Sequence, residues 1–404
     1  MSARPIRLAL VCDYLEERWA SMDLVAEMVR EHLERGHDGE VVVTTVRPPF
    51  RRRAMLVPAG GRAAGVAWNA DRALNRMVDY PRALRAIDRR ERFDLYHLVD
   101  HSYAQLVHAL PTGRAVVTCH DLDTFRCLLD PALEPRPPWF RAMTRRILTG
   151  LQRAAAVACD SAATLAAIRR HDLLPADRLR VVYLAVHPEC SPEPDPLADA
   201  EADRLLGPAD PSAGPTLLHV GTNIPRKRID VLLDTFAAVR RSMPGARLVK
   251  VGGAFTPEQE GQARSLGVLD AVTFLPPFSP RSARDRAALA AVYRRADLVL
   301  QPSDAEGFGL PAAEALACGT QVLASDLPVL REVGGDAAVY RPVGDVPSWA
   351  EAATALLDEH RRSSDSWHAR RRDGLDQASK FRWTTHVAQL VATYRDVLAQ
   401  APPR

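Results

Sequence analysis

Two glutamates separated by seven residues flank a glycine-containing turn in the segment Gln301 to Gly319, which reads QPSDAEGFGLPAAEALACG. The preceding DLVLQ run predicts a buried strand, while Pro311 suits the first turn of a helix and Gly319 suits its left-handed stop. A turn from strand to helix directs backbone N–H groups and the positive end of the helix dipole at a ligand, and phosphate is favoured there. Glu306 and Glu314 can border this pocket and accept hydrogen bonds from hydroxyl groups. Phosphate together with hydroxyl groups indicates a nucleotide sugar.

Three consecutive cations follow another predicted strand, in HVGTNIPRKRIDVLL. The strand covers residues 217–221, and Arg226, Lys227 and Arg228 lie in the loop before an amphipathic helix. Ligands of open α/β sheets gather at the carboxyl ends of strands, where Arg and Lys can neutralise a diphosphate. The ordinary alternative is a solvated basic turn. The phosphate-type turn and the paired glutamates in the same half of the chain favour the diphosphate.

A dinucleotide-binding fingerprint is a competing interpretation of the same turn. Gly307, Gly309 and Ala312 fit G-x-G-x-x-A, and Asp326 ends the next predicted strand near the offset of a ribose-binding acid. Five residues separate the preceding strand from Gly307, however, whereas the fingerprint needs its first glycine at the strand's end. The nucleotide-sugar interpretation is therefore preferred.

Composition sets the outer limits of function. The 404 residues suffice for two to three domains of about 150 residues each. A net charge of +3 gives no reason to expect binding to nucleic acid. The six cysteines are scattered without metal-ligand spacing, which predicts reduced thiols and no metal site. The apolar run at the N-terminus is short and breaks at Asp13, so we expect a cytoplasmic protein.

Short apolar runs alternate with helical patterns along the chain, which predicts parallel, doubly wound α/β sheets. The alternation stops in a segment rich in proline and acidic residues that resembles an exposed connector. The predicted organisation is a first domain at 1–190, a linker at 191–214, a second domain at 215–385 and a final helix at 386–404.

At this point two stretches carry a family resemblance: VGTNIPRKRIDVLLDTFA and QPSDAEGFGLPAAEALACGTQVLASDLPVLREVGGDAAVYRPVGD. They resemble the retaining glycosyltransferases of family 4, a group of mannosyl- and glucosyltransferases with the GT-B fold. The first half is similar more loosely, through AVVTCHDLDTF. The resemblance implies two Rossmann-like domains facing across a cleft that holds the active site. It also implies that the helix in FRWTTHVAQLVATYRDVLAQ crosses back to the first domain.

The resemblance also implies roles for individual residues. Lys227, helped by Arg226, would bind the donor diphosphate, Glu314 the ribose and Glu306 the transferred hexose. His120 would approach the sugar or acceptor from the first domain, although it can also be a histidine that merely ends a strand. The implied catalytic residues are His120, Glu306, Lys227 and Arg226; the implied donor contacts are Gly221, Thr222, Arg226, Lys227, Glu306, Gly307, Phe308, Gly309, Leu310 and Glu314; the implied acceptor-side residues are Asp121, His101, Trp19 and Ser21.

Two positions depart from the family pattern. Thr222 stands where many relatives carry an arginine, so a phosphate contact is missing or comes from Arg226 or Arg228. Trp19 and Ser21 lie where relatives often carry a double glycine, which indicates a differently shaped acceptor side.

The implied reaction transfers a hexose from a nucleoside diphosphate sugar to a hydroxyl of a glycan, lipid-linked or small-molecule acceptor, with retained anomeric configuration. No metal or other cofactor is expected, because cations and helix N–H groups would stabilise the leaving diphosphate. Hydrolysis by the two glutamates is disfavoured because it leaves the basic loop without a task. A nucleotide-sugar epimerase, a glycosyl phosphorylase and a catalytically silent partner subunit stay open. The basic, partly apolar segment 47–68 suggests an acceptor loop or a peripheral contact with the inner face of the membrane.

Overall fold

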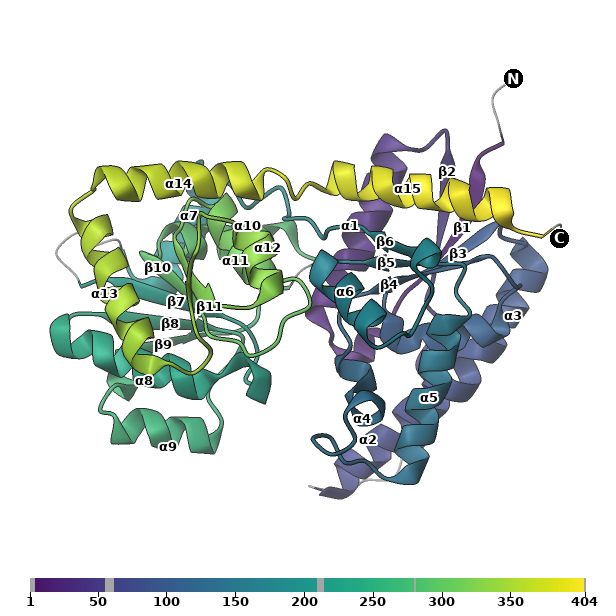
Figure 1. Ribbon diagram of the computed structural model, residues 1–404, viewed down its shortest axis with the longest axis horizontal. Helices are drawn as coiled ribbons and strands as arrows, with labels where there is room; N and C mark the ends of the chain where they lie inside the picture. The colour runs from purple at the N-terminus through teal and green to yellow at the C-terminus, as the bar shows by residue number, and fades with distance from the viewer. Residues whose placement is uncertain (1–3, 55–61, 209–213, 280, 403–404) are drawn as a thin grey trace. The chain divides into compact units, whose positions relative to one another are not determined.

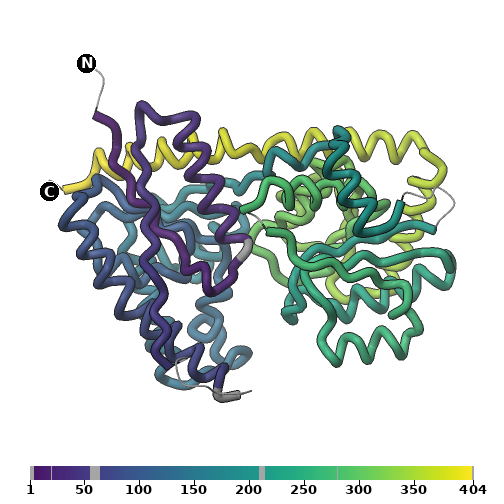
Figure 2. The backbone as a smooth tube through the Cα atoms, turned by 180° about the vertical axis from the view of Figure 1, so that it is seen from behind, coloured from purple at the N-terminus to yellow at the C-terminus, as the bar shows by residue number. Residues whose placement is uncertain are grey.

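The computed structural model describes residues 4–54, 62–208, 214–279 and 281–402 (Figures 1 and 2). The chain divides into two compact units, each described here by itself. Unit 1 comprises Met1–Tyr183 together with Trp383–Arg404, and unit 2 comprises Leu184–Arg382.

The described part of unit 1 is built on a six-stranded parallel sheet with the order β2-β1-β3-β4-β5-β6. Its central strands β3, β4 and β5 are buried throughout, as expected where helices cover a parallel sheet. Figure 1 shows α15 on one side of this sheet and α3 and α5 on the other. The strands are β1 Ile6–Val11, β2 Val41–Val46, β3 Leu95–Leu98, β4 Ala115–Cys119, β5 Ala156–Cys159 and β6 Leu179–Val181. The helices are α1 Ala20–Gly36, α2 Arg62–Leu74, α3 Tyr80–Glu91, α4 Arg126–Leu129, α5 Pro138–Gln152, α6 Ala162–Arg170 and α15 Trp383–Gln400, with the shorter turns η1 Leu15–Glu17, η3 Asn75–Asp79, η4 His101–Ala109, η5 Asp123–Phe125 and η6 Ala176–Arg178.

The C-terminal helix α15 belongs to unit 1 although unit 2 precedes it in the sequence. The buried Tyr394 hydroxyl hydrogen bonds to His97 Nδ1 on β3 at 2.7 Å. His386 Nδ1 lies 2.7 Å from the carbonyl oxygen of Tyr183. The prediction that the final helix returns to the first domain is confirmed, and the helix begins at Trp383 rather than at residue 386.

Unit 2 repeats the same architecture in its described residues, with a parallel sheet of order β12-β11-β10-β7-β8-β9. The buried Trp349 and Phe236 pack in the core between its helices and this sheet. The strands are β7 Thr216–Val220, β8 Arg247–Val251, β9 Val272–Leu275, β10 Leu298–Gln301, β11 Val322–Ser325 and β12 Val339–Arg341. The helices are α7 Pro196–Leu206, α8 Ile229–Ser242, α9 Pro257–Ser265, α10 Ala283–Arg294, α11 Leu310–Ala317, α12 Pro328–Gly334, α13 Val346–Arg361 and α14 Asp365–Ala378, with the turns η7 Pro225–Lys227 and η8 Leu269–Ala271. The predicted doubly wound parallel α/β architecture is thus confirmed in both units.

The segment 191–214, expected to be an exposed linker, instead contains α7. The Asp195 carboxylate caps its first N–H groups, and Ala198 and Ala202 are buried one turn apart. Arg294 of α10 forms an ion pair with Asp199 at 2.6 Å. The acidic residues that suggested a connector therefore form the outer face of an amphipathic helix that packs within unit 2.

The basic segment 47–68 falls partly on residues 55–61, outside the described ranges. In its described part, Phe50 stacks on Trp68 at 5.2 Å, and Arg47 and Arg53 form ion pairs with Asp23 and Asp79 of the same unit. Across the described ranges, no helix combines the length and the apolar character that crossing a bilayer requires.

Two helical glycines of unit 1 provide a test of its packing. A Cβ atom at Gly150 in α5 would lie 2.0 Å from the carbonyl oxygen of Ala104, whereas one at Gly65 in α2 would meet nothing within 4 Å. We expect Gly150→Ala to lower the free energy of unfolding by about 3 kcal/mol, because backbone must move. Gly65→Ala should be neutral or stabilising by up to about 1 kcal/mol. Urea unfolding of both variants checks this, and equal stabilities would contradict the close packing of α5.

Candidate functional site

The sheet of unit 2 has a topological switch point between β7 and β10. The chain continues from β7 outward to β8 and β9, and from β10 in the opposite direction to β11 and β12. Ligands of open α/β sheets bind beyond the carboxyl ends of strands at such a point. The loop after β7 carries the predicted cations, and the loop after β10 carries Glu306.

An ion pair links these two loops. Lys227 Nζ lies 2.6 Å from Glu306 Oε1, and the two side chains are only 12% and 6% exposed. The same oxygen accepts hydrogen bonds from Ser303 Oγ at 2.7 Å and from Gln301 Nε2 at 2.8 Å. Burial works to raise the pKa of Glu306, but Lys227 and the two hydrogen bonds hold that pKa below its usual value. The site therefore holds an ionised carboxylate beside an ammonium group at the switch point.

The loop after β7 is shaped by a short turn. The η7 segment closes with a hydrogen bond from Lys227 N to Ile224 O, and Arg228 follows in the left-handed region at φ 47°. The Arg228 guanidinium pairs with Asp230 at 2.8 Å, so its charge is compensated locally. The carbonyl oxygen of Arg226 accepts a hydrogen bond from Asp304 N at 2.9 Å, which ties the cationic loop to the loop of Glu306.

The remaining predicted donor residues line the two strand ends. The Gly221 carbonyl oxygen accepts a hydrogen bond from the buried Lys250 Nζ at 2.5 Å, and Thr222 beside it is exposed. Burial and the nearby charge of Lys227 lower the pKa of Lys250 to about 8. No sequence signal singled out Lys250, since its contact partners are backbone oxygens of neighbouring strand ends.

The predicted strand-to-helix turn is confirmed between β10 and α11. Gly309 adopts φ +94° at the start of α11, where a Cβ would lie 2.6 Å from a Leu330 methyl carbon. Phe308, between Gly307 and Gly309, is buried, and its ring meets the Phe381 ring edge-on at 5.3 Å; Leu310 begins α11. Gly307, the first glycine of the turn, lies several residues after the end of β10. A dinucleotide-binding fingerprint needs its first glycine at the end of the strand, so the turn does not fit one.

The Glu314 side chain contacts a different set of residues. Its Oε2 accepts a hydrogen bond from Tyr293 Oη at 2.8 Å, and its Oε1 lies 3.6 Å from His187 Nε2. Burial raises the pKa of Glu314, and His187 and Tyr293 oppose that rise only in part. The two glutamates of the motif thus differ: Glu306 is held ionised by a lysine, while Glu314 is a buried carboxyl among a histidine, a tyrosine and a thiol.

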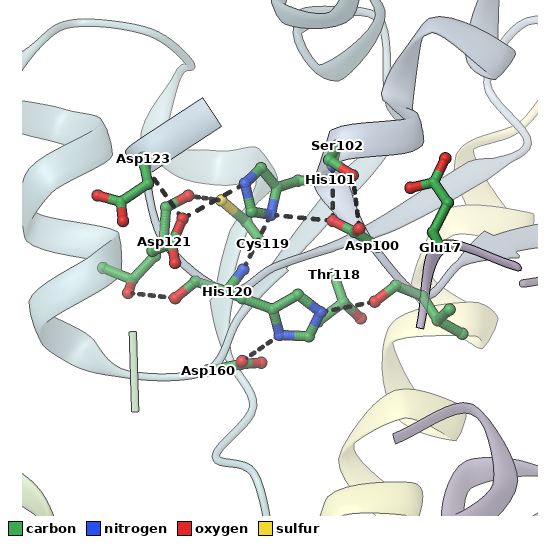
Figure 3. Close-up of polar contacts among 12 residues, drawn as sticks. Glu17, Asp100, His101, Ser102, Thr118, Cys119, His120, Asp121, Asp123 and Asp160 are labelled. Carbon is green, nitrogen blue, oxygen red and sulfur yellow. Dashed lines mark hydrogen bonds and ion pairs between the residues drawn. The ribbon is translucent and has the colours of Figure 1, made fainter. Parts of the chain in front are cut away.

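Unit 1 gathers a polar cluster at the carboxyl ends of its central strands (Figure 3). Asp13, Asp100, His120 and Asp160 follow β1, β3, β4 and β5, which are neighbours in the sheet. The switch point of this sheet lies between β1 and β3. All four side chains are buried.

His120 is held on both sides by acceptors. Its Nδ1 bonds to the Asp160 carboxylate and its Nε2 lies 2.7 Å from the carbonyl oxygen of Val99 (Figure 3). Burial works to lower the pKa of His120, but Asp160, Asp100 and the Val99 carbonyl raise it to about 9. Because each ring nitrogen needs a proton for these bonds, His120 is a buried imidazolium whose two N–H groups are occupied. The expected approach of this ring to a sugar or acceptor stays a prediction; in the structure the ring is buried and both of its nitrogens are bonded.

The acceptor-side residues of the sequence analysis lie around this cluster. His101 is buried, with Nδ1 3.3 Å from His120 N and Nε2 3.6 Å from Asp121 Oδ1. Trp19 is half-exposed and its indole N–H donates to Glu17 at 2.9 Å. Ser21 is exposed in the first turn of α1.

Two carboxylates at the switch point of unit 1 were not singled out from the sequence. Burial and the carboxylate of Asp100 raise the pKa of Asp13 well above its usual value. Burial acts on Asp100 in the same direction, but His101 and His120 lower its pKa to about 2. The pKa values of these two carboxyl groups are therefore shifted in opposite directions. The available signal was simple, because the predicted strands LALVCD, LYHLVD and AVACD each end in aspartate.

Two family models match the chain. Residues 24–189 match the model described as Glycosyltransferase Family 4, and residues 214–359 match the model described as Glycosyl transferases group 1.

Curated relatives include two D-inositol 3-phosphate glycosyltransferases. The protein from Segniliparus rotundus is 39% identical over 223 residues, covering 52% of this chain and 46% of the relative. The protein from Mycobacterium marinum is 31% identical over 294 residues, covering 70% of this chain and 59% of the relative. The chain spans about half the length of the curated relatives it matches.

Solved structures share the fold along nearly the whole chain. Sucrose-phosphate synthase from Thermosynechococcus elongatus aligns with a TM-score of 0.74 and 21% identity, covering 98% of this chain and 100% of that one. HepE from Anabaena, in complex with UDP and glucose, aligns with a TM-score of 0.68 and 18% identity, covering 97% of this chain and 100% of that one.

The paired imidazolium predicts a pH-dependent stability. The pKa of His120 in the folded protein is about 9, above its ordinary 6.5, so its contribution is fully present below pH 6.5 and is lost as pH rises through about 9. Asp160→Asn should therefore destabilise the protein most near pH 6.5, and the difference from wild type should shrink toward pH 9. Thermal unfolding at several pH values measures this difference.

The exposed Asp38→Asn provides the matched control, for which we expect no such trend. A pH-independent difference between wild type and Asp160→Asn, or an NMR titration of His120 near neutrality, would contradict the pairing.

Proposed function

Because the chain belongs to the family 4 glycosyltransferases with the GT-B fold, we propose that it transfers a hexose from a nucleoside diphosphate sugar to an acceptor hydroxyl. The observation that carries the proposal is the Lys227–Glu306 ion pair at the switch point of unit 2. It combines a cation suited to phosphate with a carboxylate suited to sugar hydroxyls.

The donor diphosphate would bind beside Lys227. The Lys227 ammonium group already lies close to an anion, Glu306. The short turn η7 holds Lys227 between β7 and β10. Arg226 belongs to the same turn and would add a second cation. As the bond to the sugar breaks, negative charge grows on the diphosphate, and cations fixed in advance stabilise that charge without reorganising.

The transferred hexose would lie against Glu306. Hydrogen bonds from Ser303 and Gln301 hold the Glu306 carboxylate in one orientation. An ionised carboxylate accepts hydrogen bonds from hydroxyl groups. Glu314 would hold the ribose, which requires its carboxylate to exchange a contact with Tyr293 or His187 for one with the nucleoside.

The transfer itself would retain the anomeric configuration and need no metal. The departing phosphate oxygen can take the proton of the attacking hydroxyl, so no separate base is required. This agrees with the state of His120, since an imidazolium with both nitrogens bonded cannot accept that proton. His120 would instead keep the strand ends of unit 1 in place by neutralising Asp160.

The acceptor is proposed to be a small hydroxylated molecule. Relatives of this chain are named for transfer to an inositol phosphate, which makes such a polyol the first acceptor to test. The buried carboxyl groups of Asp13 and Asp100 lie at the switch point of unit 1, where a polyol could hydrogen bond to them.

Nucleotide and acceptor dependence test the proposal. Thermal shifts against UDP, GDP, ADP and their sugar derivatives identify the donor, and consumption of that donor is then measured with and without an inositol phosphate or other polyol. A transferase consumes donor only with acceptor. A new sugar nucleotide formed without acceptor would identify an epimerase, and binding without turnover under any condition would identify a silent subunit.

Lys227→Ala should lower turnover about 100-fold or more, because the diphosphate loses a positioned cation in a buried setting. Lys380→Ala, at an exposed lysine of the same unit, is the matched control and should retain full activity. Steady-state kinetics with the identified donor measures both, and unchanged activity in Lys227→Ala would remove the diphosphate assignment.

Glu306→Gln should lower turnover while free nucleoside diphosphate binds at least as tightly as to wild type. The amide cannot neutralise Lys227, so the ammonium becomes more available to phosphate. Calorimetry with the nucleotide and kinetics with the sugar donor separate the two effects. Glu351→Gln, at an exposed position on α13, serves as control, and equal loss of binding and turnover in Glu306→Gln would place the residue on the nucleotide instead.

A further inference from the structure

Three buried side chains of unit 2 present a nitrogen, a sulfur and an oxygen to a common point. His187 Nε2 lies 3.4 Å from Cys190 Sγ and 3.6 Å from Glu314 Oε1, and the three atoms lie within 4.8 Å of one another. We propose that His187, Cys190 and Glu314 form a binding site for a divalent transition-metal ion of the zinc class. This inference goes beyond the proposed sugar transfer but shares Glu314 with it. An ion bound through Oε1 would leave Oε2, the oxygen that accepts from Tyr293, for the proposed contact with the ribose.

The separations fit a tetrahedral ion. Zinc lies about 2.0–2.1 Å from a histidine nitrogen, about 2.3 Å from a cysteine sulfur and about 2.0–2.2 Å from a carboxylate oxygen. At the tetrahedral angle, these bond lengths place nitrogen about 3.5 Å from sulfur and about 3.4 Å from oxygen. The observed 3.4 and 3.6 Å match those edges, and the sulfur and oxygen atoms lie within 4.8 Å of each other, so an ion could enter as the side chains adjust.

The chemistry of the donor set selects the class of ion. Imidazole and thiolate favour zinc and its neighbours in the transition series, whereas magnesium and calcium prefer oxygen ligands alone. Three protein ligands leave one position of a tetrahedral ion for water or another ligand.

Surrounding groups orient the ligands as they do in established metal sites. His187 Nδ1 lies 3.4 Å from Glu189 Oε2, and the other oxygen of Glu189 is held by Arg286 at 2.7 Å. Tyr293 donates to the Glu314 oxygen that does not face His187. A carboxylate behind a histidine ligand and a donor on a carboxylate ligand both raise the affinity for metal.

The fold also provides a turn that brings two of the ligands together. A hydrogen bond from Cys190 N to His187 O at 3.0 Å closes the turn that brings these two ligands together, and Glu314 comes from α11. Sequence spacing did not reveal the set because its third ligand lies far along the chain.

Cobalt titration tests the site on the whole protein. Chelator-treated wild type should bind one equivalent of Co²⁺ with the visible bands of tetrahedral cobalt and a thiolate-to-cobalt charge-transfer band, and Zn²⁺ should displace it. Cys190→Ala should lose the charge-transfer band and at least about 100-fold in affinity, since even an outer partner of a ligand contributes 10–100-fold. Cys127→Ala, at a buried cysteine of unit 1, should behave as wild type.

Wild type that binds no stoichiometric Co²⁺ or Zn²⁺ would overturn the proposal, as would a charge-transfer band that persists in Cys190→Ala. If Cys190→Ala does not fold, His187→Gln replaces it, and the wild-type titration is decisive by itself. Because Cys190→Ala keeps Lys227, Glu306 and Glu314, its nucleotide binding can be measured separately. Failure of the metal site and failure of the proposed transfer are thereby distinguishable.

Discussion

The carboxyl ends of parallel strands lie at one edge of a sheet. In each unit, charged side chains gather at this edge, where burial of a charge without a partner is unfavourable. The two sheets solve this problem in the same way. In unit 2 the Lys227 ammonium neutralises Glu306 between β7 and β10, and in unit 1 the His120 imidazolium neutralises Asp160 beside β4 and β5. A buried charge without a partner would cost several kcal/mol. The pairs therefore determine which side chains can meet a ligand and which are fixed within the fold.

The sequence predicted the architecture well because its signals were local. Buried parallel strands appear as short apolar runs, and Pro311, Gly309 and Gly319 act through their own backbone preferences. The predicted connector at 191–214 failed for a physical reason: composition suggested exposure, while helix α7 depends on the spacing of two buried alanines and on ion pairs with a distant helix. Local composition does not contain those contacts.

The candidate site was predictable only as a collection of residues. Strand ends and charge placed Lys227 and Glu306 in one region, but not in a direct ion pair, because the pair joins loops after β7 and β10. For His120, the strand end was correct, and the orientation of its ring was decided by Asp160 from the neighbouring strand. Glu314 shows the same limit, since its partners His187 and Tyr293 come from separate elements. The position of a residue in a motif thus predicted where in the fold it lies. The protonation state and the direction of its side chain depend on residues that are distant in the sequence.

The buried Lys250 adds a second cation to the strand ends beside Lys227. Its ammonium group bonds to carbonyl oxygens at the ends of β7 and β8, and burial together with the like charge of Lys227 lowers its pKa. Glu306 compensates only one of these two lysines closely. A diphosphate beside Lys227 would bring further negative charge to the same strand ends, which stabilises the protonated form of both lysines. In the proposed complex, the two cations would thereby contribute to affinity for phosphate, and this contribution would increase as charge develops on the leaving group.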